Sequence, residues 1–235
     1  MGARTVSAYA INANGSLTAH GSVDAGAVPT SIVVDPSGSF VYVANYDSGS
    51  ISGYAINKTN GSLTELPDSP FAFTFPGYGP HSIAVNPKGG FIYAVNEYSR
   101  NTVAVCTIET DGALTPVVAP PPLDTNDSPF SVAADPSGSF VYAVAGTGTN
   151  SGEVLAYAIA PDGTLTAVGS YPTGDYYPTS VAVDPSGSFV YVTNQVSDSI
   201  SVYAINKADG SLTAVGSPFT TATDSGPYAI AIVAR

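Results

Sequence analysis

Short apolar runs recur along the chain and alternate with turn-forming residues. In the best-defined stretch the runs are Thr179–Val183, Phe189–Thr193, Ile200–Ile205 and Leu212–Gly216. They are rich in Val, Ile, Tyr and Thr, which favour extended structure. The first two runs are joined by Asp-Pro-Ser-Gly, in which Pro presets φ and Gly permits a positive φ. The pattern predicts four antiparallel β-strands connected by tight turns and short loops.

This four-strand pattern repeats with a period near 49 residues. The block Asp-Pro-Ser-Gly-Ser-Phe-Val-Tyr occurs at 35–42, 135–142 and 184–191, and the variant Asn-Pro-Lys-Gly-Gly-Phe-Ile-Tyr at 86–93. A proline opens each unit, at positions 29, 80, 129, 178 and 227. Such regular self-similarity marks a repeat architecture.

The second strand of a unit carries apolar side chains on both faces. In the fourth copy, Phe189 and Tyr191 lie on one face and Val190 and Val192 on the other. Radial stacking of similar sheets around an axis covers both faces and leaves only short edges. We therefore expect an all-β protein, a β-propeller of about five four-stranded blades, with residues 1–235 as one domain.

The two ends of the chain together hold one unit that is short of a strand. The first strand signal occurs five times, the last at Tyr228–Ile232, whereas the second occurs only four times. We expect residues 227–235 and 1–28 to share a closing blade that lacks its second strand. Three outcomes are open: a local rearrangement fills the gap, the unpaired edges recruit another chain, or the sequence is part of a larger propeller.

Composition narrows the range of functions. Six basic and eighteen acidic residues give a net charge of −12, which disfavours binding to nucleic acid or to an anionic membrane. No apolar run approaches the eighteen or so residues of a membrane span, and the first residues show no signal-peptide pattern. Few lysines, many Ser and Thr and four glycosylation sequons favour an extracellular or cell-surface location; the sequons begin at Asn14, Asn57, Asn60 and Asn126.

The segments Phe40–Asn45 and Phe189–Asn194, each followed by Ile-Ser-x-Tyr-Ala-Ile, resemble the YVTN β-propeller repeat over nearly the whole chain. That resemblance implies a surface-layer or secreted propeller, usually with about seven blades. A more distant resemblance is to the lactonase-type propellers, through Gly79-Pro80 and Asn96-Glu97. The chain departs from the lactonase pattern after Gly-Pro, where it has His81-Ser82.

One face of such a propeller is expected to vary more than the other. The turns after the first and third strands are monotonous, whereas the loops on the opposite face differ from blade to blade, and binding residues are normally placed on variable loops. Aromatic rings there could stack on sugars or pack within the loops. The candidate binding residues are Tyr46, Asp47, Tyr78, Tyr98, Tyr176, Tyr177 and Asp198.

Aspartates at the repeated turns are predicted to be structural, because such side chains bond their own backbone. They are Asp35, Asp111, Asp135, Asp162, Asp184 and Asp209. Cys106 is the only cysteine, so no intrachain disulfide forms, and its apolar surroundings predict a buried thiol.

His81, Glu97 and Arg100 are the candidates for catalysis, since a base, an acid and a cation could converge in one blade near the pore. The favoured interpretation is that they are ordinary polar loop residues of one diverged blade, and catalysis is the alternative. No nucleophile elbow is found and two histidines cannot supply a three-histidine metal site, so we expect no metal and no cofactor.

Two functions are therefore considered. The first is a non-catalytic extracellular or cell-surface binding or structural module, which binds other chains or copies of itself through the terminal blade edges, with glycans as further ligands. The alternative is a lactonase-like hydrolase of sugar lactones that uses the variable loop face.

Overall fold

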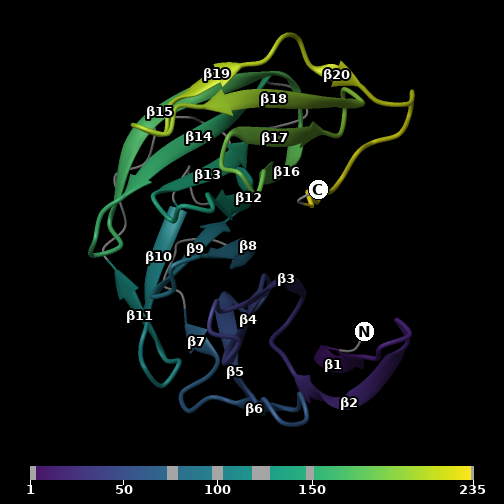
Figure 1. Ribbon diagram of the computed structural model, residues 1–235, viewed down its shortest axis with the longest axis vertical. Helices are drawn as coiled ribbons and strands as arrows, with labels where there is room; N and C mark the ends of the chain where they lie inside the picture. Colours follow the sequence, from purple (N-terminus) through teal and green to yellow (C-terminus); the bar gives the residue numbers. More distant parts are fainter. Residues whose placement is uncertain (1–3, 73–78, 97–102, 118–127, 147–150, 234–235) are drawn as a thin grey trace.

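The computed structural model describes residues 4–72, 79–96, 103–117, 128–146 and 151–233. These residues form antiparallel β-sheets, and no helix that could cross a membrane occurs among them. An all-β propeller architecture is thus confirmed. Figure 1 shows the sheets following one another along an open arc, with the two chain termini on either side of the opening.

Four of the sheets are complete blades in which strands pair in chain order. The first has β3 (Pro29–Val34), β4 (Phe40–Asn45), β5 (Ser50–Ile56) and β6 (Leu63–Glu65), with β7 (Phe71–Ala72) also on β5. The second has β8 (Pro80–Val85), β9 (Phe91–Asn96), β10 (Val103–Ile108) and β11 (Leu114–Val117). The third has β12 (Pro129–Ala134), β13 (Phe140–Ala145), β14 (Ser151–Ile159) and β15 (Leu165–Tyr176). The fourth has β16 (Pro178–Val183), β17 (Phe189–Asn194), β18 (Ser199–Ile205) and β19 (Leu212–Ala214), with β20 (Phe219–Thr220) also on β18.

An aspartate fixes the first turn of the first, third and fourth blades, and Asn86 takes its place in the second. The Asp35 carboxylate accepts hydrogen bonds from the backbone N–H groups of Ser37, Ser39 and Phe40, at 2.9, 2.7 and 2.6 Å. Burial disfavours the charged carboxylate, but these hydrogen bonds outweigh it and the pKa of Asp35 lies below its usual value. The other predicted turn aspartates also accept backbone N–H groups, which confirms their structural role; they are Asp111, Asp135, Asp162, Asp184 and Asp209.

The apolar core lies between neighbouring blades. Tyr93 of the second blade, for example, packs in one cluster with Leu155 and Tyr157 of the third, and all three side chains are fully buried. In the first three blades, a phenylalanine at the start of the second strand also fits over a glycine in the next blade. A Cβ atom added to Gly163 would overlap the Phe91 ring, so no larger residue fits there without displacement.

A buried tyrosine adds a hydrogen bond across two of these interfaces. The Tyr142 hydroxyl donates to the carbonyl of Gly210 at 3.1 Å, and Tyr42 donates to Gly112 at 2.8 Å. The equivalent residue of the fourth blade, Tyr191, is only half-buried because no following blade covers it.

We expect Tyr142→Phe to lower the free energy of unfolding by about 1 kcal/mol, since the Gly210 carbonyl stays buried without its donor. Tyr191→Phe is the matched control and should change it by less than about 0.3 kcal/mol. Urea unfolding of both variants measures the difference. Equal losses would show that the interblade hydrogen bond does not stabilise the fold.

The innermost strands are joined by serine side chains. Ser31 Oγ accepts a hydrogen bond from the backbone N–H of Ile83 in the next blade at 3.2 Å. Ser131 accepts from Val181 in the same way, at 3.3 Å. This contact holds the axis-facing ends of successive blades in a constant register.

The closing blade that we expected from both termini is not formed in the described residues. Strands β1 (Thr5–Ile11) and β2 (Leu17–Asp24) make a two-stranded sheet of their own, and residues 227–233 contain no strand. Ile230 N–H still donates to Ser180 Oγ at 3.4 Å, so this segment runs where a fifth innermost strand would lie. It has no second strand beside it, and hence no partner for a β-ladder. A ring of five blades is therefore not confirmed.

At both ends of the arc, some residues are exposed although the equivalent residues of other blades are buried. Ile32 of β3 is 56% exposed, whereas its equivalents Ile83 and Val181 are 4% and 6% exposed. At the other end, Phe189 is 37% exposed, and its counterpart Phe140 is buried against Gly210. No blade follows the fourth one in the described residues, and the two-stranded sheet β1–β2 that packs against the first blade has no inner strands to cover Ile32.

Candidate functional site

Four aromatic side chains from four successive blades form a continuous row on the variable face. The ring centroids of Tyr46 and His81 are 6.0 Å apart and those of His81 and Phe130 are 5.9 Å apart, both with edge-to-face geometry. Phe130 and Tyr177 follow at 5.1 Å. We call these four residues the aromatic arc. Edge-to-face contacts of this kind fix ring orientation as well as burying apolar surface.

A β-bulge positions the arc residues that lie on innermost strands. Pro80 pairs with Asn96 and Ser82 pairs with Val95, so His81 is the extra residue between two regular pairs. Phe130 occupies the same bulge in the third blade. A bulge redirects a side chain out of the sheet pattern, and here it repeats at the residue that follows each opening proline.

The His81 ring is oriented by a neighbouring blade. Its Nδ1 lies 2.9 Å from the carbonyl oxygen of Phe130. A carbonyl oxygen only accepts hydrogen bonds, so Nδ1 carries the proton and Nε2 of the neutral ring keeps its lone pair. Within the described part of the chain, no hydrogen bond to Nε2 is found. The imidazole is thus held in the tautomer that can take a proton at Nε2.

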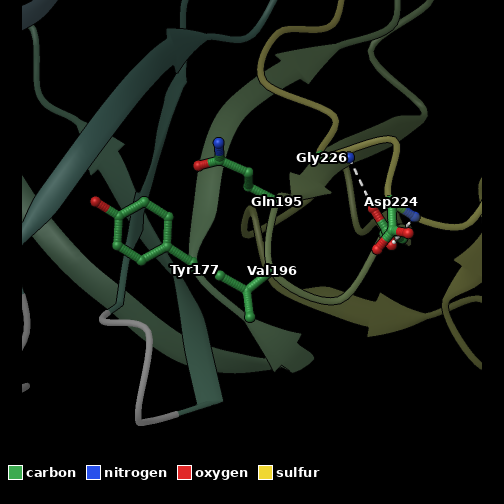
Figure 2. A pocket seen from close by; sticks show the side chains of 6 residues that line it. Tyr177, Gln195, Val196, Asp224 and Gly226 are labelled. Carbon is green, nitrogen blue, oxygen red and sulfur yellow. Dashed lines mark hydrogen bonds between the residues drawn. The ribbon is translucent and has the colours of Figure 1, made fainter.

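An open pocket of about 580 Å³ adjoins the end of the arc. It is lined by Tyr177, Gln195, Val196, Asp198, Asp224 and Gly226. Figure 2 shows Tyr177 and Asp224 on opposite sides of this view, with Gln195 and Val196 between them. The pocket therefore combines an aromatic ring, a side-chain amide and two carboxylates.

Asp198 holds one wall of this pocket in place. Its carboxylate accepts hydrogen bonds from the backbone N–H groups of Gly226 and Asp224, both at 2.7 Å (Figure 2). These bonds, that of Gly226 first, hold the pKa of Asp198 below its usual value. The carboxylate is therefore charged at neutral pH and ties the loop before residue 227 to the β17–β18 loop.

Backbone conformations of high energy gather at the same place. Tyr177, Asp198 and Asp224 have φ values of 56°, 49° and 57°, in the left-handed region that L-residues rarely adopt. All three line the pocket. Such residues concentrate at sites whose surroundings hold them for function, which makes this pocket a candidate binding site.

The structure brings together some of the predicted site residues. Tyr46, His81 and Tyr177 share the arc, and Asp198 shares the pocket with Tyr177. Asp47 and Tyr176 are exposed on the same face. Four further candidates lie outside the described residues, namely Tyr78, Glu97, Tyr98 and Arg100.

The sequence reasoning missed Phe130 and Asp224. Phe130 follows Pro129, as His81 follows Pro80, so aligning the repeats at their prolines could have identified it. No repeated signal marks Asp224. Its proximity to Asp198, 26 positions earlier, arises only in the folded chain.

The three lysines lie on the opposite face, at the turns after the first and third strands. Lys58 Nζ donates to the Ser37 carbonyl at 3.1 Å, and Lys207 Nζ donates to that of Ser186 at 2.9 Å. Lys88, in the turn after the first strand of the second blade, lies beside Gly138 in the corresponding turn of the third blade. The pocket on the variable face is thus lined by carboxylates without a lysine.

No three His, Cys, Asp or Glu side chains gather as a metal site would require, within the ranges that the structure describes. Cys106 is buried as expected, 1% exposed in β10. Burial disfavours the thiolate and raises the pKa of Cys106 to about 12.

We expect Cys106 to resist alkylation by iodoacetamide in the native protein at pH 8, because the thiolate is the reacting form and is scarce far below the pKa. The same thiol should react fully in 8 M urea, conditions that expose it. Mass spectrometry after timed quenching measures both. Rapid modification of the folded protein would contradict the burial of this side chain.

A protein-family model described as lactonase, 7-bladed β-propeller matches residues 2–69 and 53–225. A 6-phosphogluconolactonase of Formosa agariphila is 35% identical over 74 residues, which are 31% of this chain and 20% of that protein. The aligned part therefore spans only a fifth of that relative.

Solved structures show the same fold at low identity. A Lactobacillus plantarum protein superposes with a TM-score of 0.79 at 23% identity, over 96% of this chain and 67% of the other. A structure described as a putative 6-phosphogluconolactonase from Bacteroides uniformis has a TM-score of 0.79 at 20% identity, over 92% of this chain and 65% of the other. The Pseudomonas aeruginosa periplasmic gluconolactonase has a TM-score of 0.76 at 22% identity, over 92% of this chain and 64% of the other. This chain spans about two thirds of the length of these proteins.

These relationships correct the first functional interpretation. The expected non-catalytic surface module is contradicted, because the matching family and several named relatives are lactonases. The resemblance that we treated as distant is the one that is supported, whereas membership of the YVTN family is not shown. A local departure such as His81-Ser82 therefore weighs less than the match of the repeats over most of the chain.

Proposed function

Since this chain belongs to the lactonase, 7-bladed β-propeller family, we propose that it hydrolyses sugar lactones on its variable face. The observation that carries this proposal is the orientation of His81. The Phe130 carbonyl oxygen accepts a hydrogen bond from Nδ1–H, and the lone pair of Nε2 is left to act as a base.

Lactone hydrolysis requires one water molecule and two proton transfers, one from the water to the base and one from the protonated base to the leaving oxygen. His81 Nε2 takes a proton from the water as its oxygen attacks the lactone carbonyl carbon. The bond between the carbonyl carbon and the ring oxygen then breaks. The leaving ring oxygen takes the proton back from the imidazolium, so the product is an open-chain hydroxy acid and His81 is regenerated.

Glu97 and Arg100 have proposed roles that rest on their sequence position alone. Glu97 directly follows Asn96, which pairs with Pro80 beside His81. In the proposal, the Arg100 guanidinium stabilises the negative charge that develops on the carbonyl oxygen, and the Glu97 carboxylate stabilises the imidazolium.

A pH-stat assay with D-glucono-1,5-lactone tests the proposal, because each turnover releases one acid group. The expected result is an initial rate that exceeds the buffer background and is proportional to protein concentration. A rate equal to background for this lactone and for a panel of other sugar lactones would refute the function.

A further inference from the structure

We propose that Phe130 and Tyr46 are positioning residues, whose side-chain rings keep the His81 imidazole in the orientation that lactone hydrolysis requires. This inference rests on the proposed function, in which His81 Nε2 acts as a base. Phe130 and Tyr46 transfer no proton themselves. They act through the histidine that they hold.

The residue after a repeat-opening proline makes an interblade hydrogen bond in the first and fourth blades. Thr30 Oγ1 donates to the carbonyl of Pro80 at 3.3 Å, and Thr179 Oγ1 donates to the carbonyl of Pro227 at 3.1 Å. Both threonines occupy the same β-bulge that holds the arc residues of the second and third blades. A threonine that joins one blade to the next opening proline is thus the basic pattern of this position.

The second and third blades depart from this pattern at positions that meet. His81 donates one residue further along, to the carbonyl of Phe130 instead of that of Pro129. Phe130 has no hydroxyl group and cannot make the interblade hydrogen bond at all. In a sequence that otherwise repeats, local departures from the pattern are expected at functional sites. The third blade therefore gives up a structural contact and places a ring against His81.

Tyr46 is a further departure on the other side of His81. It directly follows the second strand of the first blade. The equivalent residues of the other blades are not aromatic; they are Glu97, Gly146 and Gln195. Three residues that are unusual for their positions in the repeat, from three successive blades, therefore converge on the imidazole.

The imidazole lies between two rings that both meet it nearly at right angles. The interplanar angle is 89° with Tyr46 and 88° with Phe130. The Phe130 ring is itself fixed, because it is 9% exposed and its centroid lies 5.1 Å from that of Tyr177. Edge-to-face contacts depend on the relative orientation of the rings, so they oppose rotation of the imidazole.

Rotation would remove the base from its position. A half-turn about the Cβ–Cγ bond places Cδ2 where Nδ1 was and breaks the hydrogen bond to the Phe130 carbonyl. A neutral histidine in water carries its proton mainly on Nε2, and a hydrogen bond to Nδ1–H reverses that preference. The two rings therefore preserve the hydrogen bond that leaves the Nε2 lone pair available.

Phe130→Leu removes the ring and keeps an apolar side chain of similar bulk. We expect kcat for D-glucono-1,5-lactone to fall about tenfold, the largest factor that one edge-to-face contact usually contributes to an equilibrium. KM should stay within about twofold, since the variant alters the base and not a substrate contact. Phe189→Leu is the matched control, because Phe189 is 37% exposed at the end of the row of blades and outside the aromatic arc. It should leave kcat within about twofold.

The tautomer of His81 provides a second readout that needs no substrate. Nitrogen-15 NMR distinguishes a protonated from an unprotonated ring nitrogen, and at about pH 8.5 a histidine is ordinarily neutral. The chain has two histidines, so spectra in a His20→Gln background report His81 alone. We expect the Nδ1–H form in the wild type. Phe130→Leu should shift the ratio of the two forms roughly tenfold toward Nε2–H.

Tyr46→Leu removes the ring on the other side and gives an independent test should Phe130→Leu not fold. We expect the same direction of change with a smaller size, about threefold in kcat and in the tautomer ratio, since Tyr46 is only half-buried.

The outcomes separate this inference from the proposed function. An unchanged tautomer ratio in both variants would overturn the positioning role, even with active protein. A loss of kcat with an unchanged tautomer ratio would also overturn it, because the rings would then act on the substrate instead of on His81. Wild-type protein that hydrolyses no lactone would refute the proposed function, whereas the tautomer ratios would still decide whether the two rings orient His81.

Discussion

His81→Gln is expected to lower kcat/KM for D-glucono-1,5-lactone by about 10²- to 10⁴-fold, the usual contribution of a general base. Gln can donate through its amide to the Phe130 carbonyl as Nδ1 does, but it offers no basic nitrogen at the position of Nε2. The loss should therefore appear in kcat rather than in KM. Initial rates over a range of lactone concentrations measure both.

His20→Gln is the matched control for this result. His20 lies in β2 of the two-stranded sheet, away from the aromatic arc, and its replacement should leave the rate within about twofold. Near-ultraviolet circular dichroism of both variants establishes that the tertiary structure is kept. Equal rates for His81→Gln and the wild type would exclude His81 as the base, even if the protein hydrolyses lactones.

Gly163→Ala is expected to destabilise the fold by about 3 kcal/mol. Its φ of +83° disfavours any side chain, and the added methyl group would overlap the Phe91 ring. The overlap forces the second and third blades apart. Urea unfolding, followed by circular dichroism, measures the change in the free energy of unfolding.

Gly61→Ala separates the backbone cost from the packing cost. Gly61 occupies the same turn in the first blade with a φ of +72°, but nothing lies within 4 Å of the position that an added methyl group would take. We therefore expect this variant to lose only about 1 kcal/mol. If both variants lose the same amount, the contact between Phe91 and the turn does not contribute to stability.

Much of the blade structure could be predicted because the same pattern of apolar runs and turn residues recurs in each repeat. The apolar run Thr179–Val183 corresponds to β16, and Phe189–Thr193 corresponds to β17 within one residue. The predicted strand at Tyr228–Ile232 was wrong for a non-local reason. Its sequence matches an innermost strand, but a strand also needs a partner, and none lies beside it in the described chain.

The candidate site was predictable only in part. His81 stood out because a histidine is rare in this sequence and follows a repeat-opening proline. Asp224 gave no such signal, since an aspartate in a loop rich in Ser and Thr is typical of a turn. Its role depends on Asp198 reaching across to it, and contacts between residues far apart in sequence are not encoded in local patterns.

The exposed Phe189 and the uncovered Gly61 are the two halves of one interblade contact, separated to opposite ends of the arc. The blades as described thus behave as a finite row in which each unit depends on its neighbours. The first blade lies between β1–β2 and the second blade, and the second and third blades lie between two complete blades, whereas β1–β2 and the fourth blade have one neighbour each. Local opening therefore becomes progressively easier toward the two ends, and His81 in the second blade is anchored more firmly than the pocket in the fourth.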